Sequence, residues 1–371
     1  MAFLPCLLHC FMPAGRWMRL RRSGLLVLCL GCLLSISACS KGGGAEPDPP
    51  APPPPDPEPE YALSTRAALV NDKATPEAKK VYEFLRKQFG RKIISGVMTL
   101  NSFDEVNWLK ENTGKEPGIV GLDFMHCFRG YTWYNDQEPV NDAIAYWNRK
   151  GLPVFCWHWR DPSRATEAFY TSGTSFDVSK ISDPASAEYK AMLADIDALA
   201  GQLKILQDRK VPVLWRPLHE AAGGWFWWGA KGGAACKQLY ITMYQRLVEH
   251  HQLNNLIWIW TREANDTDWY PGDAYVDIIG RDIYQQGNHG AQTAEWNAIR
   301  SGYGNNKLVA LSECGSNPDP DLLQREKGYW SWFMTWYGDF VRKPEHNTLD
   351  GWKKIMNSGY VLTLDEMPSL Q

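Results

Sequence analysis

The alternation of short apolar runs with longer amphipathic stretches predicts an α/β fold, a (β/α)8 TIM barrel. Eight β-branched or aromatic runs lie between residues 92 and 364, with helix-like segments between them. A doubly wound open sheet would show the same alternation, but no glycine-rich dinucleotide turn follows the first run. The chain has 371 residues, 44% of them hydrophobic, and a barrel of about 250 residues commonly forms one domain. We therefore expect a single barrel domain over residues 62–371.

Each expected strand is a run of five to ten residues that ends near polar or aromatic side chains. The expected strands are Lys92–Met98, Gly118–Phe124, Leu152–Trp159, Val211–Glu220, Leu256–Thr261, Val276–Tyr284, Leu308–Gly315 and Tyr360–Leu364. Helices are expected at Thr75–Phe89, Asn141–Lys150, Ala185–Asp208, Lys237–His250 and Asp319–Phe340. In such a barrel, functional residues gather at the C-terminal ends of the strands.

Only the last unit departs from this regular pattern. The eighth expected strand leaves too few residues for a following helix, so the helix at 75–89 is expected to cover that flank. Trp330, Trp332 and Trp336 fall in the expected helix 319–340, and we interpret them as one packed helix face.

The first 39 residues predict a signal peptide with a lipobox. Arginines precede an apolar run, Leu25 to Ile36, that is too short to span a bilayer. The segment Ile36-Ser37-Ala38-Cys39 resembles the lipobox of bacterial lipoproteins, which implies a lipid on Cys39 and an outer-membrane anchor in the bacterial cell envelope. An ordinary secretory signal cut near Cys39 is the alternative. The proline-rich residues 40–61 would then form a semi-rigid tether.

Composition limits the possible partners. A net charge of -3 offers no basic face, which excludes nucleic acid. The 18 tryptophans suit flat sugar faces or protein interfaces. The cysteines beyond the signal segment show no zinc-binding spacing, and buried free thiols are favoured over disulfides. These cysteines are Cys127, Cys156, Cys236 and Cys314.

Two glutamates carry the strongest chemical signal. Glu220 ends the fourth expected strand and Glu313 ends the seventh, so both carboxylates should meet over the barrel mouth. Two carboxyl groups about 5 Å apart support glycoside hydrolysis with retention, whereas about 6.5–9.5 Å leaves room for the water of an inverting enzyme. The pair therefore predicts a single catalytic domain that cleaves glycosidic bonds.

Metal catalysis is the rival explanation for the adjacent His219 and Glu220. The HExxH zinc motif fails because Gly223 stands where the second histidine is required. No GxSxG nucleophile motif occurs at a strand end either. We expect neither a metal nor another cofactor.

The surrounding motifs resemble glycoside hydrolase family 26 from about residue 65 to the end. They are Arg216-Pro217-Leu218-His219-Glu220, Trp225-Phe226-Trp227-Trp228-Gly229 and Leu311-Ser312-Glu313. The resemblance implies a retaining enzyme, most often a β-1,4-mannanase, with Glu220 as acid/base and Glu313 as nucleophile. It further implies that His219 contacts sugar hydroxyls next to the cleaved bond.

Five more side chains are expected to form the substrate site. The resemblance implies that Tyr284 donates a hydrogen bond to the nucleophile and that His158 binds sugar near the cleavage point. Asp282 shares the face of Tyr284 by the period of two and is expected to fix Tyr284 or His219. Trp225 is expected to stack on a sugar, and Trp260 is a further subsite candidate at the end of the fifth run.

Two neighbouring features are left with open or structural roles. Arg216 is expected below Glu220, either as a charged support or as part of a structural ion pair. Trp227 and Trp228 are expected to pack the loop against the barrel.

The predicted function is hydrolysis of mannan, galactomannan or glucomannan by a monomeric, two-glutamate β-1,4-mannanase. Within the same family, an exo-acting mannobiohydrolase, a β-glucanase or a β-xylanase is the alternative. Outside the enzyme class, a non-catalytic surface glycan-binding lipoprotein explains the tether and the tryptophans, but it gives no reason for the two carboxylates. The attack mode and the tolerance of galactose branches depend on loop shapes that the sequence does not show.

Overall fold

The computed structural model describes residues 65–371, in which eight parallel strands close into a barrel in the order β2-β3-β4-β5-β6-β7-β8-β9. The barrel strands are β2 Gly96–Met98, β3 Ile119–Asp123, β4 Leu152–Cys156, β5 Val213–Arg216, β6 Leu256–Arg262, β7 Ile278–Ile283, β8 Leu308–Cys314 and β9 Phe333–Thr335. The expected barrel is confirmed. The expected signal peptide with Cys39 and the tether at 40–61 lie outside the described residues.

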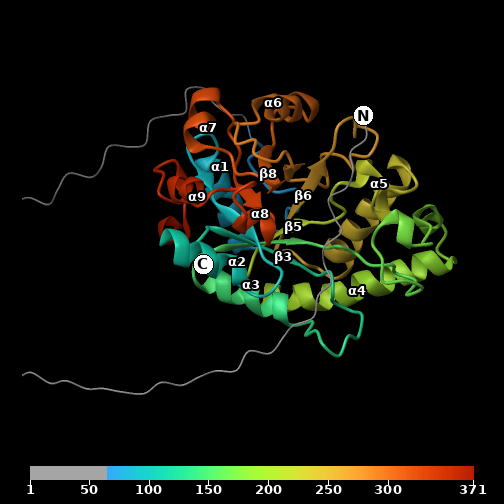
Figure 1. Cartoon of the computed structure of the whole chain (residues 1–371). Helices are drawn as coiled ribbons and strands as arrows, with labels where there is room; N and C mark the ends of the chain where they lie inside the picture. The colour runs from blue at the N-terminus through green and yellow to red at the C-terminus, as the bar shows by residue number, and fades with distance from the viewer. Residues whose placement is uncertain (1–64) are drawn as a thin grey trace, which may run out of the picture. The chain divides into compact units, whose positions relative to one another are not determined.

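Helices surround the strands, as Figure 1 shows for α1, α2, α4, α5 and α6. The helices are α1 Pro76–Gln88, α2 Asp104–Thr113, α3 Glu138–Asn148, α4 Ala187–Asp208, α5 Gly233–Tyr244, α6 Thr293–Gly302, α7 Pro320–Glu326, α8 Asp339–Arg342 and α9 Leu349–Met356. The expected cap of α1 is present, since the Thr75 side chain accepts a hydrogen bond from the Ala78 amide and Pro76 is the first helical residue.

The barrel strands are buried on both faces, which explains why they occur in the sequence as nearly continuous apolar runs. In β3, β4 and β8 every residue is buried. This pattern is typical of parallel strands covered by helices outside and packed side chains inside. It also makes a run such as Leu256–Arg262 easy to recognise, because no polar alternation interrupts it.

The eighth barrel strand was assigned wrongly from the sequence. It is β9, Phe333–Thr335, which pairs with β8 and closes onto β2, and it lies inside the expected helix 319–340. That helix ends at Glu326. The alternation Trp330, Trp332, Met334, Trp336 has the period of two of a strand. Strand β9 is only three residues long. Its flanking tryptophans are spaced in a way that also fits one face of a helix, which is why the sequence favoured a helix.

The segment expected to close the barrel forms a separate small sheet. The strands β1 Ile93–Ile94 and β10 Val361–Leu362 pair in parallel. Helices α8 and α9 follow β9 in the chain, so α1 is not the helix of the last barrel unit. Instead, α1 lies near the start of β6, where the Thr75 amide donates to the Asn254 carbonyl at 2.8 Å.

Two further expectations concern cysteines and membrane segments. Cys127, Cys156, Cys236 and Cys314 are buried free thiols, as the sequence favoured. Within residues 65–371, no helix combines the length and apolarity needed to cross a bilayer.

Candidate active site

Three carboxylates converge at the C-terminal ends of the barrel strands. Glu220 follows β5, Asp282 lies in β7 and Glu313 lies in β8. One carboxylate oxygen from each lies within 4.8 Å of the others. The two glutamates expected to meet are therefore brought together, and Asp282 joins them.

Glu313 lies on the buried strand β8, and two side chains donate hydrogen bonds to its carboxylate. Arg216 donates to Oε1 and the Tyr284 hydroxyl donates to Oε2 at 2.5 Å. The pairing of β7 with β8 shifts between Arg281 and Asp282, which places Asp282 opposite Glu313. Irregularities of this kind redirect side chains near functional sites. Tyr284 therefore has the position expected from the sequence.

Arg216 forms ion pairs inside the barrel, one of its two expected roles, whereas Asp282 takes a partner other than the expected ones. Arg216 lies between two carboxylates, donating to Asp282 at 2.9 Å and to Glu313. The second oxygen of Asp282 accepts from the Ser312 hydroxyl at 2.7 Å. Asp282 thus fixes Arg216 and fixes neither Tyr284 nor His219. Sequence spacing placed these residues on one face but could not show which of them pair.

Glu220 lies in a strained turn after β5. Leu218 and Glu220 both have positive φ angles, 51° and 53°. Such angles are unfavourable for residues with a Cβ and often mark functional turns. The Glu220 side chain is half-buried and accepts a hydrogen bond from the Trp225 indole at 2.9 Å.

The two glutamates differ in their tendency to hold a proton. Burial and the neighbouring charges of Asp282 and Glu313 raise the pKa of Glu220 well above its usual value. Burial also raises the pKa of Glu313, to about 7, but Arg216 and the Tyr284 hydrogen bond oppose this rise. When the pair shares one proton, Glu220 holds it and Glu313 is ionised.

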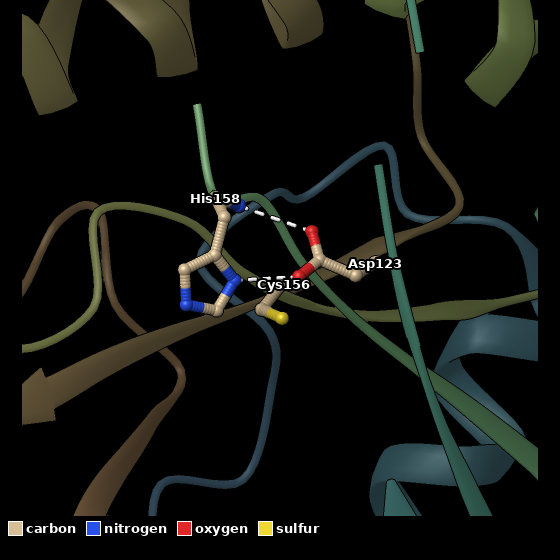
Figure 2. A group of neighbouring side chains, drawn as sticks. All are labelled: Asp123, Cys156 and His158. Carbon is tan, nitrogen blue, oxygen red and sulfur yellow. Dashed lines mark hydrogen bonds and ion pairs between the residues drawn. The ribbon is translucent and has the colours of Figure 1, made fainter. Parts of the chain in front are cut away.

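Two histidines form a hydrogen-bonded chain beside the carboxylates. His158 Nδ1 lies 2.5 Å from the Asp123 carboxylate (Figure 2). Its Nε2 lies 3.2 Å from Nε2 of His219. Burial, Arg216 and His158 hold the pKa of His219 well below its usual value, so this ring is neutral. Both histidines expected in the site are therefore present, and Asp123 is a partner that the sequence did not reveal.

The tryptophans after Glu220 divide into two groups, as expected. Trp227 and Trp228 are fully buried, and their indoles donate to the main-chain carbonyls of Trp159 and His219. They hold the loop against the barrel. Trp225 is 43% exposed and remains accessible to a ligand.

Trp260 is not part of the mouth, contrary to our expectation. Its ring is fully buried, packs against Tyr240 of α5 and donates to Asp266 at 2.8 Å. The next residue, Thr261, accepts a hydrogen bond from Arg216 inside the barrel at 3.2 Å. Alternation along β6 therefore turns Trp260 outward, toward the helices.

Two aromatic residues near the mouth were missed. Trp336 continues β9, and its ring centroid lies 5.8 Å from that of His158. It was misplaced together with the eighth strand. Trp133, in the loop after β3, is 67% exposed and stacks on Tyr131 with centroids 5.0 Å apart. The only sequence signal for a role of Trp133 in the site is the cluster of aromatic residues around it, Tyr131 and Tyr134.

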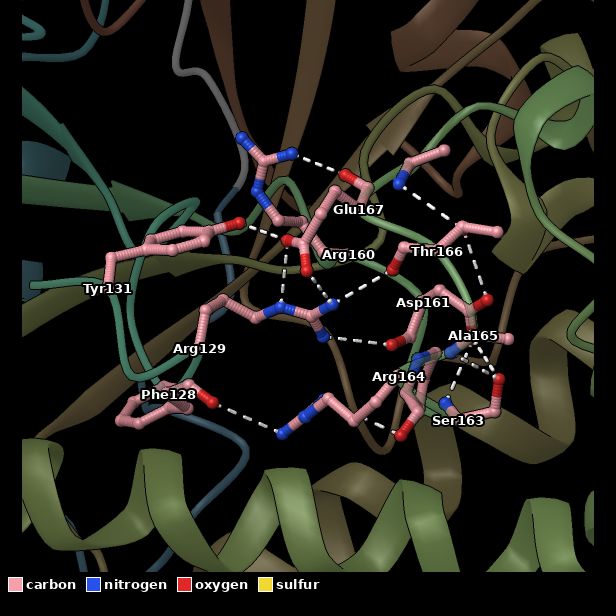
Figure 3. Close-up of polar contacts among 12 residues, drawn as sticks. Phe128, Arg129, Tyr131, Arg160, Asp161, Ser163, Arg164, Ala165, Thr166 and Glu167 are labelled. Atoms are coloured by element: carbon pink, nitrogen blue, oxygen red, sulfur yellow. Dashed lines mark hydrogen bonds and ion pairs between the residues drawn. The ribbon is translucent and has the colours of Figure 1, made fainter.

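Arg129 joins the loops that follow β3 and β4 (Figure 3). Its guanidinium donates to the main-chain carbonyls of Asp161 and Thr166 at 3.0 and 2.9 Å and to the Glu167 carboxylate. Tyr131 also donates to Glu167. The exposed Trp133 and the half-buried Tyr131 therefore lie on a loop that is anchored to its neighbour.

Within residues 65–371, two clusters have metal-binding residue types, Asp123–Cys156–His158 and Glu220–Asp282–Glu313. In the first, Asp123 and His158 bond to each other, and burial raises the pKa of the Cys156 thiol well above its usual value. In the second, Arg216 places a positive charge between two of the carboxylates. Both arrangements disfavour a bound cation.

The comparison with known families agrees with this geometry. The model of glycosyl hydrolase family 26 matches residues 70–366. The chain belongs to glycosyl hydrolase family 26.

Among curated family 26 relatives, a mannan endo-1,4-beta-mannosidase of Thermothelomyces thermophilus is 42% identical over 314 residues. The alignment covers 82% of this chain and 64% of the relative, so the chain spans less than two thirds of that protein.

Solved structures show the same similarity. A beta-mannanase from a symbiotic protist of the termite Reticulitermes speratus, complexed with gluco-manno-oligosaccharide, has a TM-score of 0.80 and 43% identity, covering 83% of this chain and 100% of that one. The Podospora anserina GH26-CBM35 beta-(1,4)-mannanase has a TM-score of 0.77 and 40% identity, covering 86% of this chain and 71% of that one.

Proposed function

We propose that this family 26 protein is an endo-acting, retaining β-1,4-mannanase that uses Glu313 as nucleophile and Glu220 as acid/base. The single observation that supports this most strongly is the distance between the two carboxylates. Their nearest oxygens are within 4.8 Å, which suits covalent catalysis and leaves too little room for the water of an inverting enzyme.

In the first step, a Glu313 oxygen attacks the anomeric carbon while Glu220 gives its proton to the departing glycosidic oxygen. The C–O bond to the leaving sugar breaks, and a glycosyl ester forms on Glu313. Arg216 and Tyr284 support this step, because their hydrogen bonds favour the ionised carboxylate that attacks.

In the second step, Glu220, now ionised, removes a proton from water as the water attacks the anomeric carbon. The ester bond to Glu313 breaks, and both carboxyl groups return to their starting states. The Trp225 indole donates to Glu220, so it stabilises the ionised form that this step requires.

The proposed substrates are mannan, galactomannan and glucomannan. The relatives named above are mannanases, and one was solved with a gluco-manno-oligosaccharide. Trp225 and Trp133 are exposed and offer flat rings for pyranose faces. We assign a sugar-hydroxyl contact to His219, whose Nδ1 is buried without a hydrogen-bond partner among residues 65–371. Both ring nitrogens of His158 are already engaged, by Asp123 and His219, so His158 acts through His219.

The experiment that tests this function follows the products from unsubstituted mannan and galactomannan. We expect a mixture of short oligosaccharides, and NMR of the first products should show the β-anomer. Mannobiose as the sole early product would support the exo alternative, and hydrolysis of β-glucan or β-xylan without mannan would redirect the substrate. Binding of mannan without release of reducing ends would support the glycan-binding rival.

We also propose that the protein is a monomer held in the outer membrane by a lipid on Cys39. The lipobox-like segment and the proline-rich tether support this proposal. Metabolic labelling with palmitate should mark the wild-type chain but not a Cys39→Ala variant. An unlabelled wild-type chain would favour the ordinary secretory signal, and light scattering of detergent-solubilised protein would measure the oligomeric state.

A further inference from the structure

Asp123 is a buried carboxylate that the two-glutamate mechanism does not use. It ends β3, and its side chain is 4% exposed. One oxygen accepts from the His158 amide at 3.0 Å, and the other lies 2.5 Å from Nδ1 of the same residue (Figure 2). Asp123 therefore fixes both the main chain and the ring of His158.

The contact continues to a third strand end. Nε2 of His158 lies 3.2 Å from Nε2 of His219, so one of these two nitrogens must carry the proton between them. Nδ1 of His219 is buried and lacks a hydrogen-bond partner among residues 65–371. A buried ring nitrogen of this kind calls for a partner supplied from outside the chain.

Two proton arrangements fit these distances. In the first, His158 is an imidazolium that donates to both Asp123 and His219, and His219 carries its own proton on Nδ1. In the second, His158 is neutral and accepts from His219, which leaves Nδ1 of His219 without a proton. The two arrangements offer a substrate opposite hydrogen-bonding groups, a donor and an acceptor.

The charges around His158 favour the first arrangement. Arg216 is already engaged by Asp282 and Glu313, so it does not neutralise Asp123. Burial and Arg160 lower the pKa of His126, which lies in the loop after β3, and that ring is uncharged. A buried carboxylate without a counter-charge is costly, and His158 is the side chain placed to supply one.

We propose that Asp123 is a positioning residue that holds His158 as an imidazolium, so that His158 donates to His219 and His219 offers its Nδ1–H to the substrate. The role toward substrate rests on the proposed function. A charged His158 also favours the ionised form of Glu313, which lies at the same C-terminal end of the barrel.

Nitrogen-15 NMR of histidine-labelled protein near pH 7 tests the proton arrangement without any substrate. Signals are assigned with His158→Gln and His219→Gln variants. We expect both ring nitrogens of His158 to be protonated, with Nδ1 protonated and Nε2 bare in His219. A bare Nε2 on His158 in the wild-type protein would overturn the proposal.

Asp123→Asn separates charge from position. The Asn oxygen can still accept from the His158 amide while its NH2 group donates to Nδ1, so the ring keeps its place but loses its charge. We expect kcat on manno-oligosaccharides to fall about 10-fold with little change in KM. Asp123→Ala, which frees the ring, should lower kcat/KM about 100-fold.

The control is Asp277→Asn, which removes another buried carboxylate next to β7 that accepts only main-chain amides. It should leave the histidine signals and kcat unchanged. Wild-type kcat and pH profile in Asp123→Asn would contradict the charge role. If wild-type protein fails to cleave mannan, the proposed function is wrong, while the NMR pattern still decides the state of His158.

Discussion

The ends of β5 and β8 place the same residue type in two different environments. Glu313 lies within strand β8, is buried, and receives hydrogen bonds from Arg216 and Tyr284. Glu220 lies in a turn with positive φ, is half-buried and receives one hydrogen bond from an indole. Both pKa values are raised and Arg216 opposes both rises, but of the two glutamates it is Glu313 that accepts a hydrogen bond from Arg216. The difference shows that neighbours, rather than residue type, decide which carboxyl group holds the proton.

The largest expected effect on activity comes from removing the carboxylate of Glu313, which receives two hydrogen bonds. Glu313→Ala should lower kcat/KM by at least about 10⁴-fold, because the variant lacks the carboxylate to which we assign the covalent intermediate. Initial rates on manno-oligosaccharides measure the loss. A variant with more than a tenth of wild-type activity would remove Glu313 from the proposed role.

Glu220→Ala should lower kcat on mannan about 10²–10⁴-fold, the range typical of the loss of a general acid. On an aryl mannoside with a good leaving group, the first step should survive, and added azide should restore turnover with a β-azide product. Absence of both responses would contradict the acid/base role, since Glu313→Ala is expected to show neither.

Tyr284→Phe removes one hydrogen-bond donor from Glu313 and so makes the environments of Glu313 and Glu220 more alike. We expect kcat to fall about 10² to 10³-fold, as for loss of one preorganised donor at a charged centre. The pKa of Glu313 should also rise, which moves the acid limb of the pH profile to higher pH. An unchanged acid limb would mean that Tyr284 does not act on Glu313.

The pH profile measures the comparison directly. Glu313 must be ionised to attack, so kcat/KM should rise with pH up to its pKa of about 7. Glu220 must be protonated to act as acid, so activity should fall again as pH rises through its raised pKa. On each limb of the profile, kcat/KM should change by nearly tenfold per pH unit. Glu220→Gln, measured on an activated substrate, should lose the alkaline limb alone.

The smallest effect is expected at Trp225, which bonds to Glu220 and exposes a ring. Trp225→Ala should raise KM about 10-fold through lost stacking, whereas Trp225→Phe should keep the ring and change only the pH profile. Trp260→Phe is the matched control, because that ring faces the helices and should leave KM unchanged. A raised KM in Trp260→Phe would contradict its placement outside the mouth.

Much of this site follows from the sequence because parallel strands end at one rim. Glu220, Glu313 and Tyr284 could be placed together from strand ends alone. The pairing of Arg216 with Asp282 and the outward direction of Trp260 could not, since one residue of register error reverses every side chain. The strand at 333–335 escaped because three residues give little period to detect. Asp123 escaped because its role depends on contacts between three strands.

The pairing of β1 with β10 joins residues 93–94 to residues 361–362, near opposite ends of the described chain. A ribosome makes the first of these strands long before the second. The barrel strand β9 is also synthesised late. Neither the closed barrel nor the β1–β10 sheet can therefore form until almost the whole polypeptide has left the ribosome. Removal of residues 360–371, which include β10, should therefore leave a protein that is readily digested by proteases.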